Sequence, residues 1–172
     1  MRTCDKQHRD ASGKIRSVDS LLYEVERHRK QKKTIVFTNG CFDVLHRGHV
    51  EYLQFCRRAG DVVIVGLNSD NSVRMIKGPE RPINNQHDRA VVLAALEVVD
   101  YVTIFDEPTP LSLIQKVRPD VLVKGEDWAE KGVVGREFVE SYGGKVALAP
   151  LVEGKSSSAT IEKMKSMKAE AR

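Results

Sequence analysis

Five short apolar runs alternate with segments of helical periodicity along this chain, and this alternation constrains the fold more than any other feature. The runs are rich in Val, Ile and Leu and are too short to be helices. They occupy residues 35–37, 61–67, 101–105, 121–123 and 146–149. Helical segments are predicted at residues 17–33, 86–96, 109–117, 136–142 and 159–171. Strands that alternate with helices form parallel sheets with right-handed crossovers, so the sequence predicts an α/β domain with a doubly wound, five-stranded parallel sheet.

The length and composition predict one globular domain. The 172 residues are 41% hydrophobic and 30% charged, which is ordinary for a domain with a real core. Residues 1–16 are polar and are predicted to form a loosely ordered extension, with the domain itself over residues 17–172. A net charge of +4 suits phosphorylated ligands but also weak nucleic-acid binding, so it excludes neither. The basic run at residues 27–33 has no interleaved aromatic side chains, which favours a solvated helix end over a nucleic-acid surface.

Three further features favour a cytoplasmic protein. The cysteines, Cys4, Cys41 and Cys56, cannot all pair and show no disulfide-framework spacing, as expected in a reducing compartment. The N-terminus is polar and shows no signal-peptide pattern. No apolar run approaches the ~20 residues that a membrane-spanning helix needs, so we expect no membrane association.

Residues 34–53 form the unit around which the rest of the chain is organised. The apolar run at 35–37 predicts a buried strand, Gly40 allows a tight turn, and a helix is predicted to begin near His46. A strand, a glycine turn and a helix start direct free backbone N–H groups and the positive end of the helix dipole at one place. This geometry predicts an anion-binding site.

His46 and His49 are three residues apart, so both side chains lie on one side of a helix that starts beside them. Two imidazoles at a helix N-terminus can donate hydrogen bonds to phosphate oxygens, and Gly48 leaves room for a base or sugar. Two other interpretations remain open, namely ordinary capping histidines, or zinc ligands together with Cys41 and Asp43. The spacing fits no closed structural zinc site, so the preceding strand and turn favour phosphate binding.

Polar clusters follow several of the predicted strands, at the edge where ligands bind in doubly wound folds. They lie at residues 38–40, 68–70, 124–127 and 154–158. The last cluster resembles the end of a P-loop, but a P-loop needs glycine where this chain has Ala149. Its three serines still precede a helix, where hydroxyl and backbone donors can bind phosphate or simply cap the helix.

The pattern Gly40-x-Phe42-Asp43-x-x-His46-x-Gly48-His49 resembles the nucleotidylyltransferase superfamily, which shares the "HIGH" signature with class I aminoacyl-tRNA synthetases. The resemblance implies a Rossmann-like nucleotidylyltransferase fold in which the two histidines stabilise the α-phosphate of a nucleoside triphosphate. Lys77 is predicted to lie in a loop at residues 71–85 that can fold over the site, and the resemblance implies that Lys77 and Arg89 contact the β- and γ-phosphates. The superfamily carries Ser-Thr-Thr before its last helix, where this chain has Ser156-Ser157-Ser158.

Residues 17–164 are more closely similar to the D-glycero-β-D-manno-heptose 1-phosphate adenylyltransferases, which occur alone or as the second domain of bifunctional ADP-heptose synthases. The matching strings are Phe37-Thr38-Asn39-Gly40-Cys41-Phe42-Asp43, Val65-Gly66-Leu67-Asn68-Ser69-Asp70, Lys77-Gly78-Pro79, Val123-Lys124-Gly125 and Val152-Glu153-Gly154-Lys155-Ser156. The implied reaction joins heptose 1-phosphate and ATP into ADP-heptose and pyrophosphate for the lipopolysaccharide inner core. Glu126, where the family places a small residue, and the triple serine depart from the pattern.

From the pattern and the resemblance together, we predict four groups of site residues. Catalytic roles fall to His46, His49, Lys77 and Arg89. Nucleotide contacts are predicted for Thr38, Asn39, Gly40, Cys41, Phe42, Gly48, Lys124, Gly125, Asp127, Ser156, Ser157 and Ser158. Substrate contacts are predicted for Asp43, Asn68 and Asp70, although Asp43 could instead cap the helix. Mg²⁺ is expected to arrive with ATP, bridging its phosphates, without a metal site built from protein side chains.

Three rival functions remain open at this point. A cytidylyltransferase for glycerol 3-phosphate or a similar ester shares the histidine motif and the Gly125-Glu126-Asp127-Trp128 region. The other two are a non-catalytic nucleotide-binding module and a basic nucleic-acid binder. The resemblance implies a homodimer or higher homo-oligomer, with the N-terminal helix as a candidate interface, and a separate heptose kinase in the same pathway.

Overall fold

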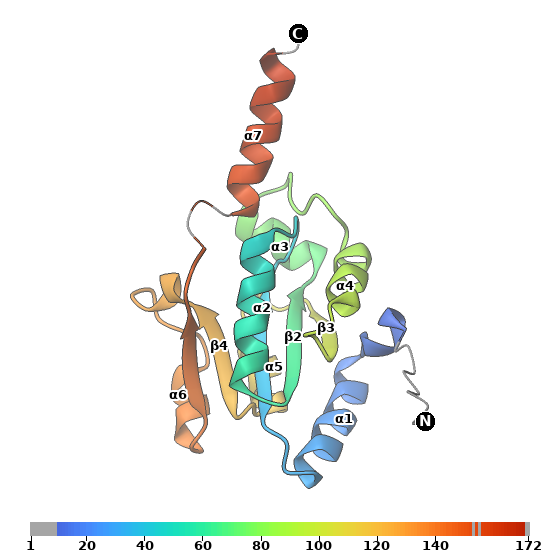
Figure 1. Cartoon of the computed structure of the whole chain (residues 1–172), viewed down its shortest axis with the longest axis vertical. Helices are drawn as coiled ribbons and strands as arrows, with labels where there is room; N and C mark the ends of the chain where they lie inside the picture. The colour runs from blue at the N-terminus through green and yellow to red at the C-terminus, as the bar shows by residue number, and fades with distance from the viewer. Residues whose placement is uncertain (1–9, 153, 155, 171–172) are drawn as a thin grey trace, which may run out of the picture.

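The computed structural model describes residues 10–152, 154 and 156–170, and its centre is a five-stranded parallel sheet of order β3-β2-β1-β4-β5 (Figure 1). This arrangement confirms the predicted doubly wound α/β class. The strands are β1 Ile35–Gly40, β2 Val62–Asn68, β3 Tyr101–Phe105, β4 Val121–Gly125 and β5 Lys145–Ala149. The helices are α1 Val18–Lys30, α2 Arg47–Ala59, α3 Asp70–Lys77, α4 Gln86–Ala95, α5 Leu111–Val117, α6 Arg136–Ser141 and α7 Ser157–Glu170, with 3₁₀ turns η1 Ala11–Lys14 and η2 Glu126–Trp128.

Helices cover both faces of the sheet, because the strands carry apolar side chains on both sides. Helices α1, α5 and α6 pack on one face, where Leu21, Val25 and Ile114 join the buried side chains of the strands. Helices α2 and α4 pack on the other face, where Leu53 and Leu93 are fully buried. Most of helix α7 extends away from this body, as Figure 1 shows, although Ile161 near its start is buried.

Strand β1 lies in the centre of the sheet, with β2 on one side and β4 on the other. The chain therefore leaves β1 in one direction through α2 and reaches β4 on the opposite side later. Ligands of doubly wound folds bind at such a reversal of strand order, beyond the carboxyl ends of the strands. The predicted site residues at the ends of β1 and β4 thus become neighbours.

The structure departs from the sequence prediction between residues 71 and 85, which we expected to form a loop. Asp70–Lys77 is helix α3, whose N-cap Ser69 accepts a hydrogen bond from the backbone N–H of Ser72, and whose Val73 is fully buried. Eight residues ending at a glycine gave too little apolar periodicity to predict it. Lys77 is therefore the last residue of a helix and does not lie in a long covering loop.

Both ends of the predicted domain also shift. Ala11–Lys14 is a 3₁₀ turn, and the backbone N–H of Arg16 donates to the Val102 carbonyl at 2.9 Å, so this part of the expected loose extension packs on the edge of the sheet. Helix α7 begins at Ser157, two residues earlier than predicted, so two of the three serines lie in its first turn. Within the described residues, no helix combines the length and apolar character needed to cross a membrane.

Candidate active site

A pocket of about 570 Å³ opens beyond the carboxyl ends of β1 and β4. Most of the predicted site residues line it, although they come from five separate stretches of the chain. Those that line it are Asn39, Gly40, Cys41, Phe42, Asp43, His46, Gly48, His49, Asn68, Lys77, Lys124, Gly125, Asp127, Ser156, Ser157 and Ser158. Thr38, Asp70 and Arg89 lie outside the lining.

The two histidines stack at the start of α2, as the spacing predicted. His46 is the N-cap of this helix, and the ring centroids of His46 and His49 are 3.9 Å apart. The Nδ1 atom of His49 accepts a hydrogen bond from the backbone N–H of His46 at 3.4 Å. Burial, with a smaller effect of His46, lowers the pKa of His49 to about 4. His49 is therefore neutral at pH 7, and with Nδ1 accepting, its proton resides on Nε2 as a hydrogen-bond donor.

The zinc interpretation finds no ligand cluster here. Among the described residues, no group of three His, Cys, Asp or Glu side chains is placed to hold a metal ion. The Asp43 carboxylate, which that interpretation needs as a ligand, is occupied elsewhere. It accepts hydrogen bonds from the backbone N–H groups of Ile83 and Asn84 and from Arg81 Nε. Asp43 thus neither caps α2 nor offers its oxygens freely to a sugar.

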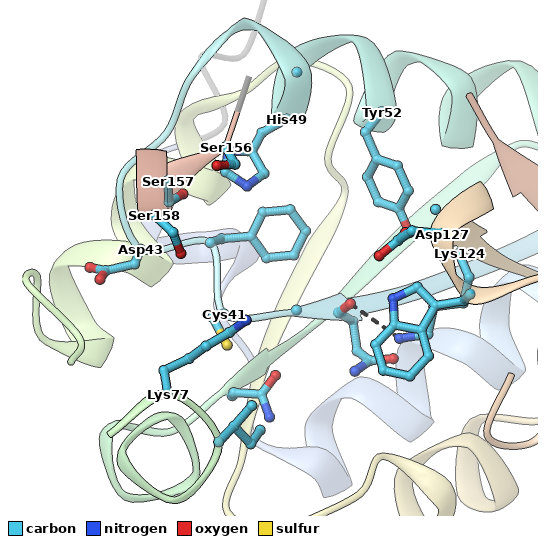
Figure 2. Close-up of a pocket in the computed structure, with 18 of the residues that line it drawn as sticks. Cys41, Asp43, His49, Tyr52, Lys77, Lys124, Asp127, Ser156, Ser157 and Ser158 are labelled. Atoms are coloured by element: carbon cyan, nitrogen blue, oxygen red, sulfur yellow. Dashed lines mark hydrogen bonds between the residues drawn. The ribbon is translucent and has the colours of Figure 1, made fainter. Parts of the chain in front are cut away.

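The three serines bring the N-terminus of α7 to the pocket. Ser156 Oγ accepts from the backbone N–H of Ala159 at 3.0 Å, and Ser157 Oγ donates to the Val44 carbonyl at 2.9 Å. These two bonds fix the first turn of α7 against the connection between β1 and α2. Figure 2 shows all three serines on the same side of the pocket as His49. The remaining backbone N–H groups and the Ser158 hydroxyl can therefore serve an anion. Glu153 and Lys155 of the same cluster lie outside the described residues.

Figure 2 shows Lys124 and Asp127 on the other side of the pocket, and Trp128 also lines the pocket. Lys124 is buried, and its Nζ lies 5.2 Å from the centroid of the half-exposed Trp128 ring. Burial lowers the pKa of Lys124 to about 8, although the charge of Asp127 opposes this. A cation, an aromatic face and an acidic side chain at one strand end suit a base and its ribose.

Tyr52 is a pocket residue that we did not predict from the sequence. Its hydroxyl lies 2.6 Å from Thr38 Oγ1 and donates to the Val123 carbonyl at 3.0 Å. These bonds hold the ring as a wall of the pocket between His49 and Lys124 (Figure 2). Helical spacing offered a signal, because Tyr52 follows His49 by three residues on α2. The contact with Tyr52 corrects the nucleotide-binding role predicted for Thr38. Thr38 is fully buried, positions Tyr52 and does not line the pocket.

Arg89 also has a different place from the one predicted. Its side chain is fully buried, and its guanidinium donates to the carbonyls of Cys41, Asn68 and Asn84 and to the Asp70 carboxylate. These partners occupy most of its donors, so Arg89 ties the pocket walls together and leaves the phosphates to other cations. The substrate contact predicted for Asp70 is corrected as well, because its carboxylate pairs with Arg89 at 2.8 Å. Asn68 remains in the lining.

Residues 37–163 match the family model described as cytidylyltransferase-like. The chain belongs to this family. Among curated proteins, this cytidylyltransferase-like chain is similar to the bifunctional protein HldE of Trichlorobacter lovleyi, with 51% identity over 92% of the chain and 32% of the relative. HldE of Syntrophotalea carbinolica is 55% identical over 88% of the chain and 31% of the relative. The chain thus spans about a third of the length of these relatives.

Solved structures agree with this assignment. The lipopolysaccharide core biosynthesis protein of Thermoplasma volcanium superposes with a TM-score of 0.57 at 26% identity, over 72% of this chain and 99% of that one. Pantoate–β-alanine ligase of Francisella tularensis superposes with a TM-score of 0.59 at 17% identity, over 84% of this chain and 68% of that one, which shows the fold alone. The comparisons confirm the family predicted from the histidine motif and the nucleotidyltransferase class of this cytidylyltransferase-like chain.

Replacing Arg89 by Met should lower the free energy of unfolding by about 3–5 kcal/mol, because it leaves the Asp70 carboxylate, which is 22% exposed, without its cation and three carbonyls without donors. Denaturant titration followed by circular dichroism measures this change. Arg74→Met, at an exposed position on α3, is the matched control and should stay within about 0.5 kcal/mol of wild type. An Arg89→Met protein of wild-type stability that only loses ATP affinity would contradict the buttressing role.

Nucleotide affinity should fall as the pH rises through about 8. Below that pH Lys124 is charged and attracts an anionic ligand, and above it the amine is neutral. Burial raises the pKa of the neighbouring Cys41 thiol above its usual value, so the thiol stays neutral over this range. Calorimetric titration at pH 7 and pH 9 should show a several-fold loss, about tenfold at most per pH unit. Lys124→Arg should bind tightly at both pH values. If Lys124→Gln lost as much affinity between pH 7 and pH 9 as wild type does, Lys124 would be excluded as the origin of the pH dependence.

Proposed function

We propose that this chain transfers an adenylyl group from ATP to D-glycero-β-D-manno-heptose 1-phosphate, giving ADP-heptose and pyrophosphate. The observation that carries the proposal is the stacked histidine pair at the start of α2, which shares one pocket with the N-terminus of α7. Two helix N-termini and a neutral N–H donor at one place favour a ligand with several phosphates. The HldE relatives and the strings shared with heptose 1-phosphate adenylyltransferases support this nucleotide and acceptor.

The chemistry asks the protein mainly for positioning and for stabilisation of charge. A phosphate oxygen of the sugar phosphate attacks the α-phosphorus of ATP, and the bond to the oxygen that bridges the α- and β-phosphorus breaks as pyrophosphate leaves. We assign the Nε2–H of His49, together with His46 and the backbone N–H groups of α2, to the α-phosphate oxygens. Because these donors are preorganised, they need no rearrangement as charge develops.

We expect Mg²⁺ to arrive with ATP, bound chiefly by phosphate oxygens and water. When bound there, the ion would neutralise charge on the pyrophosphate. The proposal places the protein in the cytoplasm, where ATP is available, as a homodimer or larger homo-oligomer. A separate heptose kinase would make its sugar phosphate.

A cytidylyltransferase acting on glycerol 3-phosphate or a similar ester is the second candidate. One observation favours it, because Asp127 and Trp128 of the Gly125-Glu126-Asp127-Trp128 region both line the pocket. The backbone N–H of Leu151 binds the Glu126 carboxylate at 2.8 Å, so Glu126 joins two loops and does not itself line the pocket. The departure at Glu126 therefore carries no argument against ATP.

Release of pyrophosphate, measured with each pairing of ATP or CTP with heptose 1-phosphate or glycerol 3-phosphate, tests the proposal. We expect turnover with ATP and heptose 1-phosphate to exceed the other three pairings by at least about tenfold, because discrimination of this size needs only one or two well-placed contacts. Preference for CTP with glycerol 3-phosphate would establish the second candidate. Nucleotide binding without pyrophosphate release for any pairing would indicate a non-catalytic module.

His49→Ala should lower kcat at least about 100-fold while leaving the melting temperature near that of wild type, because a preorganised donor to the α-phosphate is lost. The same pyrophosphate assay under saturating ATP measures the effect. His87→Ala provides the matched control, since this histidine is exposed on α4 and lies outside the pocket. Near-wild-type turnover of His49→Ala would remove the histidine from the mechanism.

A further inference from the structure

A second arginine, Arg81, lies at the pocket in the connection between α3 and α4. Its side chain is only 13% exposed, and it lines the pocket beside Asp43 and Lys77. Its Nε donates to Asp43 Oδ2 at 2.8 Å. Over the described part of the chain this is the only hydrogen bond of its guanidinium, so the two terminal amino groups keep their donors for a ligand.

Asp43 is built to hold that guanidinium in place. Its side chain is fully buried, and its two oxygens also accept from the backbone N–H groups of Ile83 and Asn84 at 2.8–2.9 Å. Burial by itself would raise the pKa of this carboxyl, but the N–H groups of Asn84 and Ile83 and the Arg81 guanidinium lower it below its usual value. Asp43 therefore stays charged and fixes one edge of Arg81 while the other edge remains open.

The comparison with Arg89 shows why Arg81 is the arginine available to a ligand. Arg89 donates to four protein acceptors and lies outside the pocket lining. Arg81 donates to one and lies in the lining. A guanidinium with two free amino groups matches two oxygens of a phosphate group, a geometry that the lysine ammonium lacks.

The position of the Arg81–Asp43 ion pair within the pocket indicates which phosphates Arg81 contacts. In Figure 2 Asp43, Lys77, Ser157 and Ser158 lie on one side, whereas Lys124 and Asp127 lie on the other. Under the proposed function the base and ribose occupy the second side, and the histidines mark the α-phosphate. The first side then receives the β- and γ-phosphates.

We infer that Arg81 binds the β- and γ-phosphates of the nucleotide and stabilises the departing pyrophosphate, with Asp43 as its positioning residue. This inference rests on the proposed nucleotidyl transfer, in which the bond from the α-phosphorus to the bridging oxygen breaks and negative charge moves onto pyrophosphate. A fixed cation at that end binds the product-like charge more strongly than the ground state. It gives the loop at residues 78–85 a chemical role.

Calorimetric titration of Arg81→Met with ATP, pyrophosphate and AMP, each with Mg²⁺, tests the inference. ATP and pyrophosphate affinities should fall about ten- to a hundredfold, the range for a charged hydrogen bond, while AMP affinity stays within about twofold. Arg81→Lys should recover part of the loss. Arg74→Met, which removes an exposed arginine outside the pocket, should change none of the three.

The Asp43→Asn variant tests whether Asp43 positions Arg81, because it leaves the charge of the Arg81 guanidinium in place. The amide oxygen can still accept from the backbone N–H groups of Ile83 and Asn84, but its NH₂ group then faces the Nε donor of Arg81 and releases the guanidinium. We expect the same selective loss of ATP and pyrophosphate affinity, smaller than in Arg81→Met. If Asp43→Asn does not fold, as judged by circular dichroism, the Arg81 variants decide the question alone.

Three results would overturn the inference. Equal losses for ATP and AMP, or no loss for either, would take Arg81 away from the outer phosphates. A raised KM for the sugar phosphate with unchanged pyrophosphate affinity would place it on the acceptor. Failure of the proposed function is distinguishable, because wild-type protein that releases no pyrophosphate with any acceptor can still be titrated with pyrophosphate alone.

Discussion

The buried guanidinium of Arg89 is the interaction on which the pocket depends most. It joins the carbonyls of Cys41, Asn68 and Asn84 with the carboxylate of Asp70, and these four groups come from the ends of β1 and β2, the start of α3 and the entry to α4. Parallel strands end with carbonyls that the sheet does not pair. A fully buried cation with several donors satisfies them together, and its charge is balanced by Asp70. The walls of the site are therefore held by one network.

The pocket combines neutral and charged donors, and burial affects both kinds. Desolvation lowers the pKa of His49 to about 4, so this ring donates without a charge, whereas Lys124, whose pKa burial lowers to about 8, is still charged at pH 7. Backbone N–H groups at the starts of α2 and α7 add donors without adding a full charge. Full positive charge that stays independent of pH is supplied by an arginine paired with a carboxylate, as Arg81 is with Asp43.

Much of the fold was predictable because the information is local. Five β-branched runs and the helices between them define a parallel sheet, and the ends of such strands converge whatever the loops do. Most predicted site residues consequently line one pocket. The direction of a side chain in β1 was not predictable, because residues 35–38 are all buried in a strand covered on both faces, so alternation carries no signal. Thr38 therefore seemed a ligand contact.

The roles of the arginines were unpredictable for a related reason. Sequence shows that Arg81 and Arg89 are cations near a histidine motif, but their difference arises from their partners, which lie 38 residues away for Arg81 and 5 to 48 residues away for Arg89. Only the fold shows which guanidinium is already occupied. Helix α3 added a further difficulty. Because this helix is too short to predict, the sequence did not show that the segment after it, which includes Arg81 and Asn84, returns to Asp43.

The connection from β1 to α2 explains how one short motif organises the remaining walls. Asp43 anchors the backbone of Ile83 and Asn84, and the carbonyl of the next residue, Val44, accepts from Ser157 at the start of α7. Two adjacent residues between the glycine turn and the histidines thus hold both of the other segments that face the phosphate end. The spacing from Gly40 to His46 is then set by three requirements together, namely the turn, these two anchors and the N-cap of α2. A change of one residue in that spacing would displace the anchored segments as well as the histidines, because all of them are attached to the same six-residue connection.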